Sequence, residues 1–131
     1  MHRFIEENYM LPKRVMLVDD SKTIRITTGE ILEGLGYEVM CCTDGFNAIS
    51  NMISFNPDLV FIDVEMPRLD GLQTVRLIRA NKTFRDIPLV MLSSKDGIFD
   101  LAMAQNAGAT DYIVKPPSQQ SIQAVIAKLF H

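Results

Sequence analysis

The sequence has few cysteines, no long hydrophobic run and little excess charge of either sign. Its two cysteines, Cys41 and Cys42, are adjacent. Because neighbouring strand side chains point to opposite faces, we expect neither a structural disulfide nor a metal site there. No apolar run approaches the ~20 residues that a membrane-spanning helix needs. The net charge of −3 gives no general attraction to nucleic acid or to an anionic membrane. The expected location is a reducing, cytoplasmic one.

The length and the composition indicate a folded chain of ordinary size. The 131 residues are 47% hydrophobic and 22% charged, which is typical of one globular domain and excludes a disordered chain. Residues 1–12 include acidic and amide side chains, so they are not a secretory signal. We expect residues 1–12 to be a flexible extension and residues 13–131 to form the domain.

Short apolar runs alternate with amphipathic stretches along the chain. Each run is continuous and most end abruptly at a polar residue, which is typical of parallel strands buried on both faces. Five such strands alternating with five helices predict a doubly wound α/β sheet with right-handed crossovers. The predicted strands are 15–18, 37–42, 59–62, 89–92 and 112–114.

Apolar residues between these runs recur at helical spacing. Gly36 is expected to end the first helix, and Asp44 and Asp70 are expected to precede the second and third. The predicted apolar stripes are Ile24, Ile31, Leu32 and Leu35; Ala48, Ile49, Met52 and Ile53; Leu72, Val75 and Ile78; a fourth helix over about 98–107; and Ile122, Val125, Ile126, Leu129 and Phe130.

The polar residues that follow the apolar runs are the candidate functional residues. In an open parallel sheet the functional crevice lies outside the carboxyl ends of the strands. Those positions hold Asp19, Asp20, Asp63, Ser93 and Lys115. Two carboxylates ~5 Å apart repel by roughly 3 kcal/mol at an effective dielectric of about 20, and one lysine cannot neutralise three acids. A divalent cation can, and oxygen-only ligands suit Mg²⁺ better than zinc.

A carboxylate beside Mg²⁺ is also a nucleophile toward phosphorus. Asp63 ends the strand expected at the centre of the sheet, so it is the best-placed nucleophile. Asp20 and Asp19 are expected to hold the metal, directly or through water. Lys115 and the Ser93 hydroxyl are expected to bind phosphoryl oxygens from other sides. For any one of these residues alone, a solvated rim of the sheet is the simpler interpretation.

These motifs resemble the receiver domain of two-component response regulators, which has the CheY-like fold. The likeness covers about residues 13–130, and the closest similarity is to stand-alone receivers of chemotaxis and twitching-motility (type IV pilus) systems. It implies a flavodoxin-like sheet of strand order 2-1-3-4-5. The likeness rests on Val18-Asp19-Asp20-Ser21, Asp63 with Met66-Pro67 and Asp70-Gly71, Met91-Leu92-Ser93-Ser94, and Tyr112 with Lys115-Pro116.

The resemblance implies a phosphorelay function in which the chain is a signalling switch and not an enzyme with an external substrate. Asp63 would take a phosphoryl group from a histidine kinase of the chemotaxis type. Mg²⁺, or Mn²⁺ as a substitute, would be bound by Asp20, Asp63 and the backbone carbonyl of Glu65, with Asp19 bound directly or through water. Ser93 and Tyr112 would then move, remodelling the face made by the fourth helix, the last strand and the last helix for a separate protein partner.

Two departures from the family pattern concern the strand ends. Pro117 stands where the family usually has Phe, which removes an aromatic anchor from the output face. Ser93 replaces the commoner Thr and keeps the hydroxyl. The Lys115–Pro116 peptide is typically cis in this family, and the sequence does not determine its isomer.

Two other α/β classes share part of this pattern. A haloacid-dehalogenase-type phosphatase also uses a nucleophilic Asp and Mg²⁺, but its D-x-D-x-T motif would need Asp and Thr where this chain has Glu65 and Pro67. A flavin-binding electron carrier would need a phosphate loop after the first strand, where Asp19 and Asp20 would repel the phosphate. The phosphatase is the alternative function.

Overall fold

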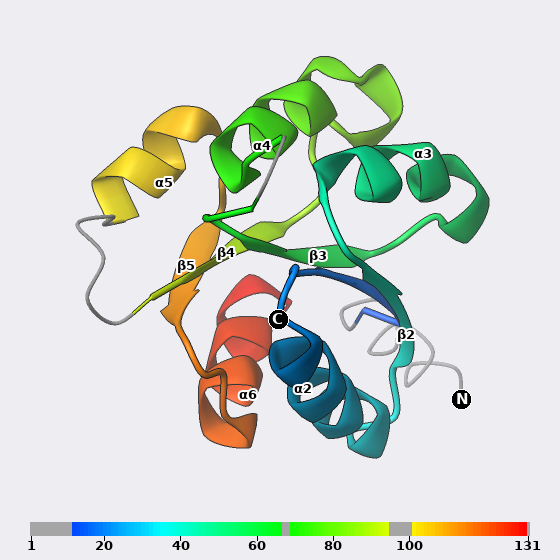
Figure 1. Ribbon diagram of the computed structural model, residues 1–131, viewed down its shortest axis with the longest axis vertical. Coiled ribbons are helices and arrows are strands. Elements are labelled where there is room, and N and C mark those ends of the chain that lie inside the picture. Colours follow the sequence, from blue (N-terminus) through cyan, green and yellow to red (C-terminus); the bar gives the residue numbers. More distant parts are fainter. Residues whose placement is uncertain (1–11, 67–68, 95–100, 131) are drawn as a thin grey trace, which may run out of the picture.

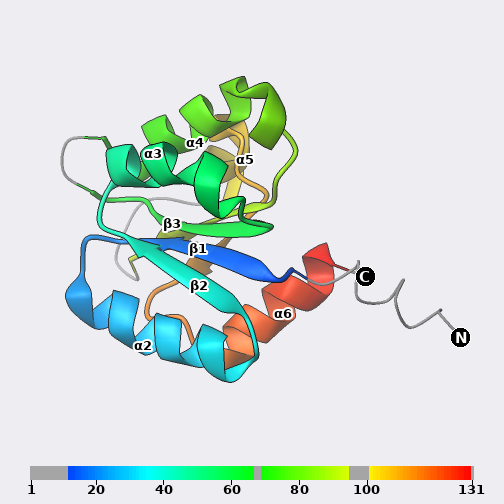
Figure 2. The ribbon, with the colours of Figure 1, turned by 90° about the vertical axis from the view of Figure 1, so that its right-hand side faces the viewer.

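The computed structural model describes residues 12–66, 69–94 and 101–130 of the chain. Five parallel strands form one sheet in the order β2-β1-β3-β4-β5, which confirms the predicted topology. Helices α3, α4 and α5 cover one face of this sheet, and α2 and α6 cover the other (Figures 1 and 2). Residues 1–11, which make up nearly all of the predicted extension, lie outside the described residues.

The strands and helices agree with the predicted segments to within a few residues. The fourth helix was expected from about residue 98, and residues 95–100 lie outside the described part. The strands are β1 (Arg14–Val18), β2 (Glu38–Cys42), β3 (Leu59–Asp63), β4 (Leu89–Ser93) and β5 (Asp111–Val114). The helices are α2 (Lys22–Gly34), α3 (Gly45–Phe55), α4 (Gly71–Ala80), the 3₁₀ turn η1 (Lys82–Phe84), α5 (Leu101–Ala107) and α6 (Gln119–Leu129).

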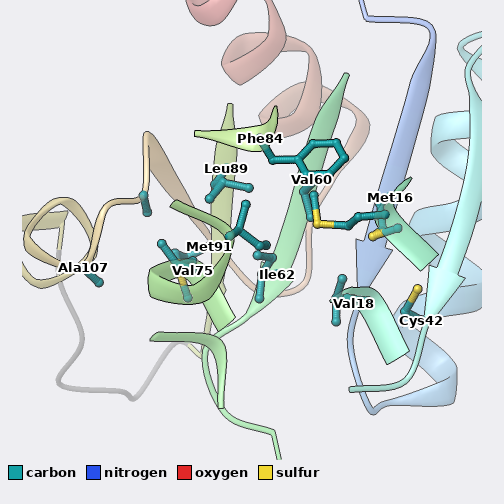
Figure 3. Close-up of a cluster of buried hydrophobic side chains, with 14 of the residues drawn as sticks. Met16, Val18, Cys42, Val60, Ile62, Val75, Phe84, Leu89, Met91 and Ala107 are labelled. Carbon is teal, nitrogen blue, oxygen red and sulfur yellow. The ribbon is translucent and has the colours of Figure 1, made fainter. Parts of the chain in front are cut away.

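Apart from Arg14 at the start of β1 and the polar last residues Asp63 and Ser93, the central strands are apolar because both of their faces are buried. Successive residues of β1 alternate between two core clusters. Met16 and Val18 join the cluster under α3, α4 and α5 (Figure 3), while Val15 and Leu17 join the cluster over α2 and α6. All four side chains are fully buried. This packing explains the continuous apolar run, which fixes the carboxyl end of each strand at one edge of the sheet.

The helix ends follow the predicted signals. The Asp44 side chain accepts from the backbone N–H of Asn47, and Asp70 forms a reciprocal capping box with Gln73. Gly36, at φ 99°, follows α2 in the left-handed region, where a residue without a Cβ is favoured. These caps start α3 and α4 immediately beside the carboxyl edge of the sheet.

The apolar stripe predicted for α3 is wrong in two positions. Ile49 and Ile53 are 36% and 77% exposed, whereas Ala48, Met52 and Phe55 face the core. The i, i+4, i+7 row already fills the space against the sheet, so the residues one position further around the helix are turned away from it.

Both cysteines are free, with Cys41 exposed and Cys42 buried. Their opposite orientations confirm that this pair makes no disulfide. No helix among residues 12–66, 69–94 and 101–130 is long and apolar enough to span a bilayer.

Candidate functional site

The four strand-end positions predicted from the sequence meet at one edge of the sheet. Asp63 is the last residue of the central strand β3, and Ser93 is the last residue of β4. The strand register places Asp63 beside Leu92 and Ser93 beside Val114. Lys115 follows Val114 directly, and its backbone N–H donates to the Ser93 carbonyl at 2.7 Å. Parallel pairing therefore brings together side chains that are far apart in the sequence.

Three carboxylates form the acidic part of the site. One oxygen from each of Asp19, Asp20 and Asp63 lies within 4.8 Å of the others. Asp19 and Asp63 are almost completely buried, at 0% and 1% exposure, and Asp20 is exposed. This is the clustering predicted from the strand ends, with one carboxylate open to solvent.

Within the described part of the chain, Lys115 is the cation that contacts these acids. Its Nζ lies 2.9 Å from Asp63 Oδ1 and 3.6 Å from Asp19 Oδ2. The Lys115–Pro116 peptide is cis, which answers the question that the sequence left open. One ammonium against three carboxylates leaves a local excess of negative charge, as the sequence predicted.

Burial and mutual repulsion disfavour the ionised form of the two inner acids. Burial raises the pKa of Asp63 to about 6, against the lowering effect of the Lys115 hydrogen bond and with repulsion from Asp19. Burial also raises the pKa of Asp19. Burial alone would lower the pKa of Lys115, but Asp63 and the other two acids outweigh it and raise that pKa. The site is therefore strained electrostatically and would gain from a further positive charge.

Backbone groups fix the orientation of the two inner carboxylates. Asp19 Oδ1 accepts from the N–H of Ser21 at 2.8 Å, and Asp63 Oδ1 accepts from the N–H of Glu65 at 3.2 Å. Gly71, the first residue of α4, packs against the backbone of Asp63, and a Cβ at this position would overlap the Asp63 carbonyl oxygen. The Asp70-Gly71 pair thus lets α4 begin in contact with the site.

The second oxygens of the buried carboxylates lack hydrogen-bond partners. Among the described residues, Asp19 Oδ2 and Asp63 Oδ2 are buried and accept no hydrogen bond, although Asp19 Oδ2 has an ion-pair contact with Lys115 Nζ at 3.6 Å. A buried carboxylate oxygen without a donor is costly, and a cation is a suitable partner for it. Hard oxygen ligands at this spacing fit Mg²⁺, so these residues are able to hold the ion that the sequence predicted.

The two residues expected to move on activation lie close to this cluster. Ser93 is 2% exposed, and its hydroxyl donates to the Ser94 carbonyl at 3.3 Å. Tyr112 on β5 is half-buried and packs against the core cluster under α3, α4 and α5. Ser93 therefore lies beside the acidic cluster, at the end of β4. Tyr112 lies on the neighbouring strand β5, which is the outermost strand on this side of the sheet.

One contact to the site was not assigned from the sequence. Arg25 Nη1, from α2, donates to the backbone carbonyl of Asp19 at 2.8 Å. Arg25 stands in the run Asp-Asp-Ser-Lys-Thr-Ile-Arg after β1. With Ser21 as N-cap, Arg25 falls in the first turn of α2, close to the strand end, and this spacing was the available signal.

Several known proteins resemble this chain over most of its length. The family model for the response regulator receiver domain matches residues 15–127. Protein PilG of Pseudomonas aeruginosa is 43% identical over 113 residues, which are 86% of this chain and 84% of PilG. Response regulator MprA of Mycolicibacterium vanbaalenii is 36% identical over 114 residues, 87% of this chain but only 48% of MprA.

Solved structures show the same arrangement. Chemotaxis protein CheY4 of Vibrio cholerae superposes with a TM-score of 0.83 at 27% identity, covering 90% of this chain and 98% of that one. The receiver domain of the sensor histidine kinase PA1611 of Pseudomonas aeruginosa PAO1 gives a TM-score of 0.81 at 27% identity, covering 89% and 96%. That structure has a magnesium ion coordinated in its active site cleft.

Proposed function

The chain belongs to the response regulator receiver family, and on that premise we propose that Asp63 is its phosphoacceptor. Receiver domains accept a phosphoryl group from histidine kinases and signal to downstream targets. The chain is thus a phosphoacceptor signalling switch, and nothing in its relatives supports the phosphatase alternative. The observation that carries the assignment to Asp63 is its place at the end of the central strand, where Oδ1 accepts from Lys115 and Oδ2 has no donor among the described residues.

The reaction that these atoms support is an in-line phosphoryl transfer. A carboxylate oxygen of Asp63 attacks the phosphorus of a phosphohistidine, an O–P bond forms and the P–N bond breaks. The bonding electrons go to the imidazole nitrogen of the kinase, and the product is an acyl phosphate on Asp63. Lys115, already 2.9 Å from Asp63 Oδ1, is placed to stabilise the negative oxygens that arrive.

Receiver domains bind Mg²⁺ in their acidic site, and this chain offers the residues for it. Asp20 and Asp63 would be the side-chain ligands, with the Glu65 backbone carbonyl as a third and Asp19 binding directly or through water. The ion, or Mn²⁺ in its place, would neutralise charge on the phosphoryl oxygens during transfer. Asp19, Asp20 and Asp63 already lie within 4.8 Å of one another, so the chain need not rearrange to bring them together.

The transferred group would offer Ser93 and Lys115 additional acceptor oxygens, beside the partners that each already has. A phosphoryl group adds up to about two negative charges and three acceptor oxygens. Among the described residues, the Ser93 hydroxyl donates to its neighbour's carbonyl at 3.3 Å, a long hydrogen bond that costs little to exchange for one to a phosphoryl oxygen. This gain exists only in the phosphorylated state, which is what a shift between two conformations requires.

The output surface is proposed on α5, β5 and α6. Tyr112 would swing inward behind Ser93 and change the shape of this surface. Met103 on α5 and Val114 on β5 are 43% and 47% exposed, and exposed apolar side chains are typical of a surface that binds a protein. A separate target protein would bind here.

A role in motility signalling is the finer part of the proposal. It is supported by the likeness to chemotaxis protein CheY4 and to Protein PilG over most of both chains. The test is phosphotransfer from each histidine kinase encoded in the same genome, with rates compared at equal kinase concentration. A preferred chemotaxis-type kinase supports the role, and preference for another kinase class contradicts it.

Phosphorylation itself is tested with a small phosphodonor. Acetyl phosphate with Mg²⁺ should add about 80 Da to the intact protein, as one phosphoryl group does. Asp63→Asn should abolish the gain. The matched control is Asp86→Asn. Asp86 is exposed and precedes β4, so it lies at the amino ends of the strands, opposite the site. A mass gain that survives Asp63→Asn contradicts the assignment.

A further inference from the structure

The loop between β1 and α2 carries two of the three acids, and its conformation is held from outside the acidic cluster. The Asp19 backbone N–H donates to the Cys42 carbonyl at 3.0 Å, which ties it to the end of β2. Its side-chain Oδ1 accepts from the N–H of Ser21. Its carbonyl oxygen accepts from the guanidinium of Arg25 at 2.8 Å. The peptide plane that leads from Asp19 to Asp20 is therefore set by Arg25.

We propose that Arg25 is a positioning residue that fixes the Asp19–Asp20 peptide and thereby places the Asp20 carboxylate for Mg²⁺. The inference rests on the proposed metal site and assigns the device that preorganises it. Asp20 is exposed, so no packing against the core holds it in place. An exposed side chain that must meet a metal depends on the backbone that carries it.

Arg25 acts through this hydrogen bond and not by neutralising the acids. Lys115 is the cation whose Nζ approaches the carboxylates, at 2.9 and 3.6 Å, whereas the Arg25 guanidinium donates to a backbone carbonyl. The backbone N–H of Arg25 donates to the Ser21 carbonyl at 3.0 Å, so the guanidinium extends from the first turn of a capped helix. This arrangement fixes the loop and leaves the negative charge of the site available to a dication.

The surroundings of Arg25 make it a usable target for mutation. With Lys22, Cys41 and five further residues, it lines an open surface cavity of about 420 Å³. Removing the guanidinium therefore widens a solvent-filled space and opens no void in the core. The fold is expected to survive the substitution, because buried cavities and not surface ones carry the large costs.

The experiment compares Arg25→Met, Arg25→Lys and Arg85→Met with the unmodified chain. Arg25→Met keeps the aliphatic stem and loses the donor, and Arg25→Lys keeps one donor and the charge. Arg85→Met removes the same charge from an exposed residue before β4, at the amino ends of the strands and opposite the site. Mg²⁺ is titrated into each metal-free protein by calorimetry, and urea unfolding is measured in parallel. Amide hydrogen exchange of Ser21 without metal reports the loop alone.

Arg25→Met should raise the Mg²⁺ dissociation constant about tenfold, within the range seen when a partner of a metal ligand is removed. It should also speed exchange of the Ser21 amide, while Arg25→Lys restores most of both and Arg85→Met changes neither. If the Mg²⁺ affinity of Arg25→Met equals that of the unmodified chain, or falls no further than that of Arg85→Met, the proposal is overturned. Equal losses in Arg25→Lys and Arg25→Met, with no change in Ser21 exchange, also overturn it.

Two further results keep this test separate from the proposed function. If Arg25→Met does not fold, Arg25→Gln replaces it, because the amide is shorter than the guanidinium and cannot reach the same carbonyl. If the unmodified chain itself binds no Mg²⁺, the metal site fails, and the positioning role fails with it. If the unmodified chain binds Mg²⁺ and Arg25→Met binds it equally well, only the positioning role fails.

Discussion

At the scale of single residues, Asp63 combines the two properties that a phosphoacceptor needs. It is buried enough to lose its hydration, and it keeps one oxygen that accepts no hydrogen bond from the residues the structure describes. Each hydrogen bond from water or protein stabilises a carboxylate oxygen and makes it a weaker nucleophile. The raised pKa of Asp63 shows what this arrangement costs in the absence of metal.

The pKa of Asp63 predicts how stability depends on pH in metal-free protein. Its pKa is about 6 in the folded chain and 3.8 for the ordinary group, so between about pH 4 and 6 the folded state binds more protons than the unfolded one. The free energy of unfolding therefore falls as the pH rises through this window. Asp63→Asn should reduce this dependence, leaving the smaller part that comes from the raised pKa of Asp19, and should stabilise the protein at pH 7 by about 1–3 kcal/mol.

Urea unfolding with EDTA at pH 5 and pH 7 measures both effects. Asp86→Asn serves as the control, since this exposed acid is expected to change neither. A less stable Asp63→Asn protein at pH 7 would show that the Lys115 ion pair outweighs burial, contrary to the expectation.

At the scale of elements, the start of α4 is fitted to the site by a missing side chain. A Cβ on Gly71 would overlap the Asp63 carbonyl oxygen and approach Met91 Cε at 2.8 Å. Gly71→Ala should destabilise the fold by about 1–3 kcal/mol, as overpacking does, and slow phosphorylation by acetyl phosphate. Gly34→Ala is the matched control, because nothing lies within 4 Å of its Cβ position. Equal stability of the two variants would contradict this packing.

The face that α3 turns to solvent gives a second element-scale prediction. Met52 is 3% exposed and Ile53 is 77% exposed, although they are neighbours in sequence. Met52→Ala should cost about 2–5 kcal/mol of unfolding free energy, and Ile53→Ala should change it by less than about 0.5 kcal/mol. Chemical denaturation of both variants checks the orientation of the helix. Similar losses in the two would restore the stripe predicted from the sequence.

Much of the fold was predictable because the sheet is buried on both faces. Such strands must be apolar throughout, so their ends are visible in the sequence, and parallel pairing then places Asp63, Ser93 and Lys115 at one edge. The α3 stripe was not predictable in full, because helical spacing marks apolar residues without showing which of two adjacent rows meets the sheet. The Arg25 contact depends on a long side chain reaching a backbone oxygen, and the spacing from Ser21 places this side chain near the site without showing which atom it reaches.

At the scale of the whole molecule, phosphorylation should be detected far from Asp63. Acetyl phosphate with Mg²⁺ is expected to shift the NMR resonances of Tyr112, Met103 and Val114 as well as those of the site. Ser93→Ala should still be phosphorylated and should lose most of the distant shifts, because the hydroxyl is the group that gains a new partner. Retained shifts at Tyr112 in Ser93→Ala would contradict this coupling.

The strand order determines how phosphorylation can change the output surface on α5, β5 and α6. The proposed phosphoacceptor, Asp63, lies on β3, the third of the five strands across the sheet, and β5 is one edge strand. A conformational change that begins at β3 must cross two inter-strand spacings, roughly 10 Å in total, to reach β5. The conformational change must pass from each strand to its hydrogen-bonded neighbour, and β4 is the strand that lies between β3 and β5. Substitutions that slow the switch, or that activate it without phosphorylation, should therefore concentrate on β4. We expect this even where the substituted residue contacts neither the phosphoryl group nor the target protein.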